Sequence, residues 1–350
     1  MEEKTNLFYC DVIKNTMMLL VVAYHSMALW NRNIWLVPPL DPAPYFTICA
    51  AFFNNLHIYT FTFASGYIFY FTRFERTSKS NFYESMINRI KQLIIPYIAG
   101  ALLWCVWFDI SIDSLIISDV VHKYILAENP SQLWFLLMLF NVFCITLVFK
   151  DFFRKQKAIV GVSVCLVLYL IGLVLGKISP NLFQFQTALK FLIFYYLGFK
   201  YRQFKSEKHQ LPANSVLLMA CFEIILFGIS YYLDGLQGLN SVMKVGEMAI
   251  NLLLHINGPL LVFAFCENNA EKIQCLLANS VVHRWLKQRS YLIYIFHQQM
   301  VYIVVFLLNG KTHPIVLFLI SFSICILVAG TIASIILKIK TLRILFTGRT

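Results

Sequence analysis

The chain has 350 residues, of which 59% are hydrophobic and only 13% are charged, and its mean hydropathy is +0.69. Soluble domains carry about 25% charged residues, so this composition excludes a water-soluble enzyme or binding module and indicates a protein that crosses a membrane several times. The formal net charge of +12 would suit a nucleic-acid-binding protein, but the placement of the basic residues argues against that class.

Apolar runs of about 20 residues, the length that crosses a bilayer as a helix, recur along the whole chain. They lie at 12–30, 45–72, 93–108, 133–149, 158–176, 186–201, 213–233, 244–266, 290–309 and 314–337. We therefore predict an all-α polytopic membrane protein of about ten transmembrane helices, with one membrane domain over residues 1–350.

The basic residues alternate between the two sides of this arrangement. With the N-terminus inside, 22 of the 29 Lys and Arg residues fall in inside segments, six fall in outside segments, and Lys14 lies in the first span. This excess follows the positive-inside rule, so both termini are expected in the cytoplasm and the charge reports topology, not nucleic-acid binding. The nine cysteines lie mostly within spans without a C-x-x-C pair, which predicts buried apolar residues and no metal site.

Residues 11–30, which include the first span, contain two ionisable side chains, Lys14 and His25. Eleven positions make three helical turns plus about 20°, which places both on one face about 16 Å apart along the axis. Met18 and Val21 lie between them on that face. Since an ionisable group within a span is costly and commonly functional, we predict a track into the membrane, with a cation at its inner mouth and a titratable base deeper in.

The second span contains His57 and, two turns later, Ser65 and Gly66. Small residues within a span often allow close packing of two helices, and this reading accounts for Ser65 and Gly66 as well as a functional one does. His57 is a stronger candidate for function, because a neutral imidazole in lipid still needs polar partners.

A basic cluster follows the second span. Its members are Arg73, Arg76, Lys79, Arg89 and Lys91. Each one alone is typical of a topology anchor at the lipid headgroups. Together, at the cytoplasmic mouth of the Lys14 stripe, they could hold the phosphates of an anionic donor.

The later spans add four more ionisable residues: Glu223 in the seventh, Glu247 and His255 in the eighth, and His297 in the ninth. Glu247 and His255 are eight positions apart, about 80° round a helix, so they do not lie on one line. For His255 and His297, hydrogen bonding to a neighbouring side chain is the alternative to a functional role.

These features, in this order, resemble the acyltransferase-3 family of integral membrane acyltransferases, particularly its branch of fucose-4-O-acetylase-like sugar O-acetyltransferases. The family opens with a basic residue and, after ten more residues, a histidine, as at Lys14 and His25. Its second-span motif of a histidine followed by Ser-Gly-Tyr is similar to residues 57–67, with the same spacing.

Three further motifs carry the resemblance: Arg89 with Leu-Ile-Ile-Pro-Tyr at 93–97, Leu-Trp-Phe-Leu at 133–136, and Ile-Tyr-Ile-Phe-His-Gln at 293–298. The chain departs from the family where Lys14 replaces the commoner Arg, Asn15 replaces a usual Gly, and Tyr59 replaces a usual Pro.

The resemblance implies an enzyme that moves an acyl group, expected to be acetyl, from cytoplasmic acyl-CoA to a hydroxyl of a lipid-linked or cell-surface sugar, in a bacterial cytoplasmic membrane. His25 is expected to act as the general base, since imidazole titrates near neutrality, or to carry the acyl group transiently. A carboxylate would orient its ring, and the candidates are Glu223, Glu247 and Asp11.

The thioester oxyanion would receive hydrogen bonds from His57, Ser65 or His297. The residues expected at the acetyl-CoA donor are Lys14, Ser65, Arg73, Arg76 and Arg89, and no metal is needed.

Two other classes of protein would use the same residues differently. A transporter or flippase would employ the intramembrane ionisable groups as a proton relay, although the sequence shows no inverted repeat and no pair of Gly/Pro-broken spans. A membrane scaffold or sensor without catalysis would tolerate replacement of His25 by Asn or Leu.

Overall fold

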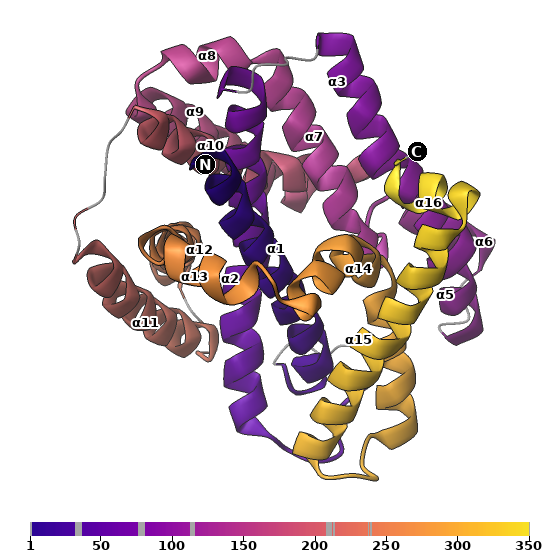
Figure 1. Cartoon of the computed structure of the whole chain (residues 1–350). Helices are drawn as coiled ribbons and strands as arrows, with labels where there is room; N and C mark the ends of the chain where they lie inside the picture. Colours follow the sequence, from indigo (N-terminus) through magenta and orange to yellow (C-terminus); the bar gives the residue numbers. More distant parts are fainter. Residues whose placement is uncertain are drawn as a thin grey trace. The chain divides into compact units, whose positions relative to one another are not determined.

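The computed structural model describes residues 2–31, 37–75, 81–112, 116–207, 212, 214–236, 238 and 240–349. These residues form helices and connecting segments, and no strand occurs among them (Figure 1). The prediction of an all-α protein is confirmed.

The chain divides into two compact units that each combine distant parts of the sequence. Unit 1 comprises Met1–Ala64, Lys208–Ser290 and Val301–Cys325, and unit 2 comprises Ser65–Glu207, Tyr291–Met300 and Ile326–Thr350. The division falls inside three continuous helices, α2 (Pro44–Tyr70), α14 (Val281–Leu308) and α15 (Pro314–Lys338).

Besides its parts of these three helices, unit 1 contains long helices joined by short connections. They are α1 (Glu2–Met27), the 3-10 turn η1 (Ala28–Trp30), α11 (Ser215–Asp234), α12 (Ser241–Asn268) and α13 (Ala270–Leu277). Helix α12 packs along α11, and α1 packs against both α12 and α13.

Unit 2 contains a larger number of shorter elements. They are η2 (Phe71–Glu75), α3 (Phe82–Arg89), η3 (Ile90–Ile94), α4 (Ile95–Gly100), η4 (Ala101–Cys105), α5 (Val106–Ile112), α6 (Ile117–Val120), η5 (Val121–Ile125), η6 (Ser131–Leu133), α7 (Trp134–Val148), α8 (Lys150–Lys155), α9 (Ala158–Ile178), η7 (Leu182–Gln184), α10 (Phe185–Ser206) and α16 (Lys340–Thr347). Of the η elements, η2, η3, η4 and η5 are π-helical turns, and η6 and η7 are 3-10 turns.

Eight helical segments of the described chain are long and apolar enough to cross a membrane. They are Phe8–Trp30, Phe82–Ser111, Ser131–Val148, Ala158–Ile178, Ser215–Asp234, Ser241–Asn268, Val281–Leu308 and Pro314–Lys338. The other two predicted spans, 45–72 and 186–201, coincide with α2 and α10, whose polar residues, such as Asn54 and Asn55 in α2 and Lys190 in α10, lower their hydropathy. The total of ten spans therefore stays a prediction.

The third span is longer than its apolar run suggested, because helical structure continues around Pro96. A proline cannot donate to the carbonyl four residues earlier and its ring crowds that carbonyl. Here a π-helical turn, η3, precedes Pro96, and the freed Gln92 carbonyl accepts a hydrogen bond from the Tyr291 hydroxyl at 2.8 Å. The helical segment that could cross the membrane accordingly runs over Phe82–Ser111 and extends beyond the predicted 93–108 at both ends.

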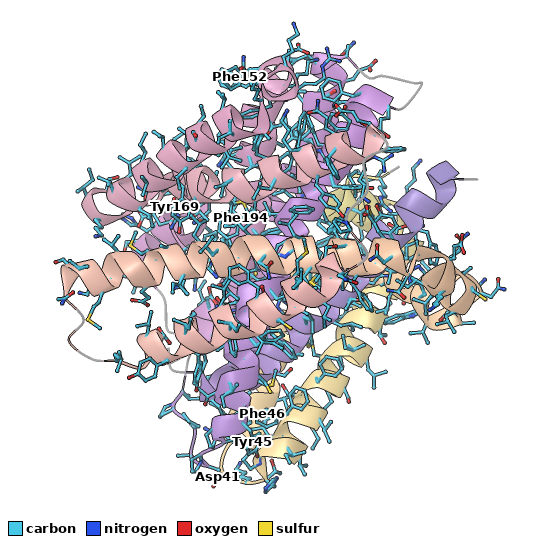
Figure 2. The ribbon with its side chains drawn as sticks, turned by 90° about the vertical axis from the view of Figure 1, so that its left-hand side faces the viewer. Asp41, Tyr45, Phe46, Phe152, Tyr169 and Phe194 are labelled. Atoms are coloured by element: carbon cyan, nitrogen blue, oxygen red, sulfur yellow. The ribbon has the colours of Figure 1, made fainter. Side chains whose placement is uncertain are left out.

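An aromatic contact joins the end of α1 to the beginning of α2 in unit 1. The indole Nε1 of Trp30 donates to the Asp41 carbonyl at 2.8 Å, and its ring lies 4.8 Å from that of Phe46. Figure 2 shows Asp41, Tyr45 and Phe46 close together in this part of unit 1. The Thr47 hydroxyl also donates to the Trp30 carbonyl at 2.6 Å, so the exit of α1 is fixed against α2.

Glycine allows two close approaches between helices of unit 2. A Cβ atom at Gly66 would lie 1.9 Å from the Tyr195 carbonyl oxygen of α10. A Cβ at Gly161 of α9 would lie 2.0 Å from the Tyr196 hydroxyl. Gly66 requires glycine because the atom it would meet is backbone, whereas at Gly161 the Tyr196 side chain would have to move. The Gly66 contact supports the packing interpretation of the Ser65–Gly66 pair.

Candidate active site

Helix α1 carries both Lys14 and His25 without interruption, and both side chains are half-buried. Met18 and Val21, which lie between them on the same face, are 1% and 4% exposed. This face of α1 is therefore covered by protein instead of facing lipid.

His25 and His57 both contact one tyrosine, Tyr24, in unit 1. The Tyr24 ring centroid lies 4.9 Å from that of His25 and 5.5 Å from that of His57. The Asn31 side chain donates to the Tyr24 hydroxyl at 3.5 Å. Tyr24 was missed by the sequence reasoning, because an aromatic residue in an apolar span carries no distinguishing signal. It brings imidazoles from α1 and α2 into one cluster, which we call the histidine cluster.

The orientation of His57 determines which of its nitrogens can act. His57 is 1% exposed, and its Nδ1 hydrogen-bonds the Phe53 carbonyl of its own helix. A carbonyl only accepts, so Nδ1 carries the proton and Nε2 of the neutral ring is an acceptor. An oxyanion-donor role for His57 therefore requires the imidazolium form.

The candidate carboxylates have different surroundings. Glu223 is 4% exposed, and its carboxylate accepts a hydrogen bond from Asn257 Nδ2 at 2.8 Å, which joins α11 to α12. Asp11 forms an ion pair with Lys287 at 2.7 Å and lies fourteen residues before His25 on one helix, about 21 Å along the axis, so it cannot orient that ring. Glu247 is half-buried on α12.

His255 is held by neighbouring side chains. Its Nε2 lies 2.8 Å from Asn55 Oδ1, and its ring stacks on Tyr59 at 3.7 Å with an interplanar angle of 13°. The alternative of a histidine bonded by its neighbours is thus confirmed for His255. Tyr59, one of the departures from the family motif, has a structural partner in this stack.

In unit 2, Arg73 and Arg89 lie close together over an aromatic floor. Arg89 lies 4.7 Å from the Phe143 ring centroid, Arg73 lies 5.8 Å from that of Phe69, and the two rings are 5.5 Å apart. Burial, and then the charge of Arg89, lowers the pKa of Arg73. Two mutually repelling guanidinium groups make a favourable place for an anion, and we call this pair the arginine pair.

Two π-helical turns position the arginine pair. Arg73 lies within η2, and Arg89 is the last residue of α3 immediately before η3. Such turns are rare in proteins, and those that do occur often lie at functional sites. Arg76, the third predicted arginine of the donor site, lies outside the described residues.

A buried ion pair fixes the end of η2. Arg202 of α10 donates to both carboxylate oxygens of Glu75, through Nε at 2.8 Å and through Nη2, and its Nη1 donates to the Tyr67 hydroxyl at 2.7 Å. Arg202 was counted only as an inside basic residue in the sequence, because its partner lies 127 positions away.

His297 lies on α14 and is fully buried, with Nδ1 2.6 Å from the Tyr294 carbonyl. As for His57, Nε2 of its neutral ring is an acceptor. Ser65 is half-buried on α2 immediately before Gly66.

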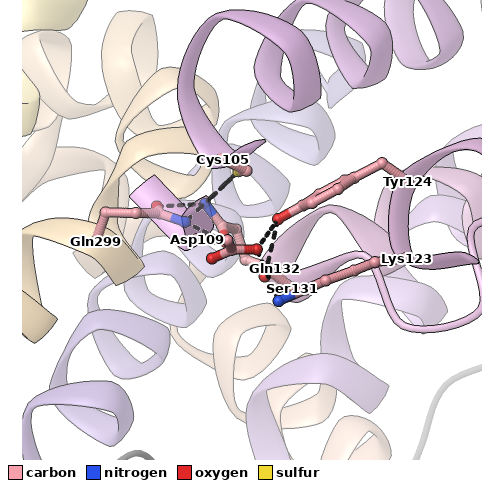
Figure 3. A network of polar contacts seen from close by, with 7 residues as sticks. All are labelled: Cys105, Asp109, Lys123, Tyr124, Ser131, Gln132 and Gln299. Carbon is pink, nitrogen blue, oxygen red and sulfur yellow. Dashed lines mark hydrogen bonds and ion pairs between the residues drawn. The ribbon is translucent and has the colours of Figure 1, made fainter. Parts of the chain in front are cut away.

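A buried polar network, drawn in Figure 3, surrounds the next turn of α14. Gln132 Nε2 donates to Gln299 Oε1 at 2.7 Å and to the Ile295 carbonyl at 2.6 Å, and Trp104 donates to Gln299 Oε1 at 2.9 Å. The Tyr294 hydroxyl donates to the Gln132 carbonyl. These bonds hold residues 294–299 in register with the beginning of α7.

The network continues from the end of the third span, at Asp109, into the loop that the sequence places outside the membrane. Asp109 forms an ion pair with Lys123 at 2.7 Å and accepts a hydrogen bond from Tyr124. Burial, and then Cys105 and Asp109, raises the pKa of Tyr124, so its phenol stays protonated as a donor. Asp109 is thus engaged within the protein.

The predicted residues fall into two groups. Unit 1 holds Lys14, His25, His57, Glu223 and Glu247, and unit 2 holds Ser65, Arg73, Arg89 and His297. Within unit 1, Tyr24 links His25 to His57, and within unit 2 the arginine pair is assembled.

The helices and the ionisable groups buried within each unit define a multi-pass membrane protein. The sequence model of the acyltransferase domain family Acyl_transf_3 matches residues 7–338, which include segments of both units. The chain belongs to this family, and it is a membrane acyltransferase. No curated protein and no solved structure matches the chain.

Proposed function

We propose that this acyltransferase moves an acetyl group from cytoplasmic acetyl-CoA to a hydroxyl of a lipid-linked or cell-surface sugar, with His25 as the general base. The observation that carries the proposal is the histidine cluster, in which Tyr24 contacts both His25 and His57. An imidazole held against a tyrosine ring that also contacts a second, tautomerically fixed imidazole suits proton transfer near neutral pH. The enzyme would reside in a bacterial cytoplasmic membrane, with ten spans and both termini inside.

In the proposed reaction, the sugar hydroxyl attacks the thioester carbonyl as His25 accepts its proton. The new C–O bond forms, the C–S bond breaks, and the proton passes to the departing CoA thiolate. Ser65, or His57 or His297 in the imidazolium form, would donate to the oxyanion. Glu223 or Glu247 would stabilise the imidazolium form of His25. Because Glu223 already accepts a hydrogen bond from Asn257, the half-buried Glu247 is the favoured partner.

The arginine pair would hold the donor at its phosphates, and Lys14 enters the same proposal on its sequence motif alone. Arginine suits this role because its planar donor groups match phosphate oxygens. Two π-helical turns and the Arg202–Glu75 pair support the positions of Arg73 and Arg89. Arg76 belongs to the same proposal on its sequence position.

The test is acyl transfer by the full-length protein in lipid nanodiscs with radiolabelled acetyl-CoA and glycans from the host cell surface. We expect label on the glycan with the wild type and at least about a hundredfold slower transfer with His25→Ala, the scale of general-base catalysis. His313→Ala, at an exposed histidine, is the matched control and should behave as the wild type.

Wild-type transfer by a folded His25→Ala protein would remove the proposed base. Movement of the glycan across proteoliposome membranes without acylation would instead favour the transporter alternative. Mass spectrometry of surface glycans from cells with and without the protein would identify the acylated sugar.

A further inference from the structure

A buried histidine near the beginning of α14 has a hydrogen-bonding group that the proposed chemistry does not yet use. His283 is the third residue of α14 and is 6% exposed, and its backbone N–H donates to the N-cap hydroxyl of Ser280 at 3.2 Å. Asn15 of α1, 5% exposed, places Nδ2 3.4 Å from His283 Nδ1. The Phe8 ring lies 5.0 Å from the imidazole. All these residues belong to unit 1.

The contact with Asn15 determines the tautomer of His283. An amide nitrogen only donates, so Nδ1 of His283 accepts and the proton lies on Nε2. That Nε2 atom is buried and has no hydrogen-bond partner among the described residues. Since buried donors are almost always paired, this Nε2–H indicates a ligand that brings an acceptor atom.

The charges around His283 favour an anionic acceptor. Lys14 directly precedes Asn15 on α1, and Lys287 lies one turn beyond His283 on α14. Asp11, the acidic group that acts on His283 here, is paired with Lys287 at 2.7 Å. The amide groups at the beginning of a long helix add a positive potential. Asp11 has the larger of the two charge effects on His283, but its carboxylate is paired with Lys287, which leaves Lys14 and the beginning of the helix to favour an anion at Nε2.

We propose that His283, positioned by Asn15, forms a phosphate-binding subsite at the inner end of α1, and that the phosphate belongs to the acyl-CoA donor. This inference rests on the proposed function, which makes acyl-CoA the donor. The subsite would hold the donor next to Lys14, at the beginning of the helix face that leads to His25. Asn15, one of the three residues that depart from the family motifs, would be a specificity-determining position.

The same chemistry would also suit the phosphate of an anionic lipid, so the test separates the two sources. CoA binding is measured by calorimetry on the full-length protein in nanodiscs of zwitterionic lipid. We expect His283→Leu to weaken CoA binding about tenfold to a hundredfold, the scale of a hydrogen bond to a charged group. His283→Gln, which keeps an N–H donor at a similar reach, should retain most of the affinity. His313→Leu is the exposed control.

Steady-state kinetics provide a second reading: in His283→Leu the KM for acetyl-CoA should rise while kcat changes little. Asn15→Ala leaves His283 in place and should weaken CoA binding several-fold, which keeps the inference testable if His283→Leu fails to fold.

Equal CoA affinity of folded His283→Leu and wild type would overturn the subsite and leave the proposed function standing. If the wild type itself does not bind CoA, the proposed donor is wrong and the subsite assignment falls with it. A third measurement compares the stability of the two proteins against unfolding in nanodiscs of anionic phosphatidylglycerol. If these nanodiscs stabilise the wild type but not His283→Leu, while both proteins bind CoA equally, the phosphate belongs to a lipid and the donor assignment is overturned.

Discussion

The Arg202–Glu75 pair offers a quantitative test of how the proposed donor site is held. Arg202 is 9% and Glu75 is 22% exposed at the side chain, and two hydrogen bonds join them. In Arg202→Met the Glu75 carboxylate loses both of these bonds. Removing one partner of a buried pair costs about 3–5 kcal/mol, and the partial exposure of Glu75 reduces this to roughly 2–3 kcal/mol.

The double variant Arg202→Met/Glu75→Gln should lower the free energy of unfolding by less than the two single variants do in sum, because no buried charge remains without its partner. We expect a coupling energy of about 1–3 kcal/mol. Denaturant titration of the detergent-solubilised protein measures it, with Lys155→Met, at an exposed lysine of α8, as the control.

The same pair predicts a kinetic effect, because Glu75 and Arg73 share the turn η2. Arg202→Met should raise the KM for acetyl-CoA more than it changes kcat. Additive costs in the double-variant cycle would refute the energetic coupling. An unchanged KM in a folded Arg202→Met protein would refute the link between this pair and donor binding.

Substitutions at three further positions test other parts of the protein. Tyr24→Phe keeps the ring between the two imidazoles and should stay within a few-fold of wild-type turnover, whereas Tyr24→Ala should lose about tenfold or more through misplacement of His25; equal activities of the two would contradict the role of the ring. Arg89→Gln should raise the KM for acetyl-CoA roughly tenfold, measured by initial rates. Gly66→Val should destabilise the protein by about 3 kcal/mol or more, because its Cβ would meet the Tyr195 carbonyl; Gly228→Val, with open space around it, should express and melt like the wild type.

Sequence periodicity predicted the long elements well because apolar length alone determines them. The run at 12–30 lies within the helical segment Phe8–Trp30, and the fourth, fifth, seventh and tenth runs agree with helices within a few residues. The prediction for the third span was too short, since the π-helical turn and the Tyr291 hydroxyl that accommodate Pro96 leave no local signal in the sequence.

The candidate site was predictable only where one helix sets the geometry. Lys14 and His25 share a face of α1 by helical period, and that face is covered by protein. The partners of Asn15 and Arg202 could not be found in this way, because His283 and Glu75 lie 268 and 127 positions away in the sequence. Such contacts depend on tertiary packing, to which a single sequence gives no direct access.

The covered face of α1 bears on how water is kept from the acyl group. Met18 and Val21 close the strip between Lys14 and His25, so a donor arm that follows this face must displace them. Met18 suits this role because its unbranched side chain adopts new rotamers readily, whereas the stem of Val21 is stiff. A strip that opens only around the donor would exclude water from the donor arm between Lys14 and His25, and exclusion of water is what favours transfer to a sugar over hydrolysis of the thioester.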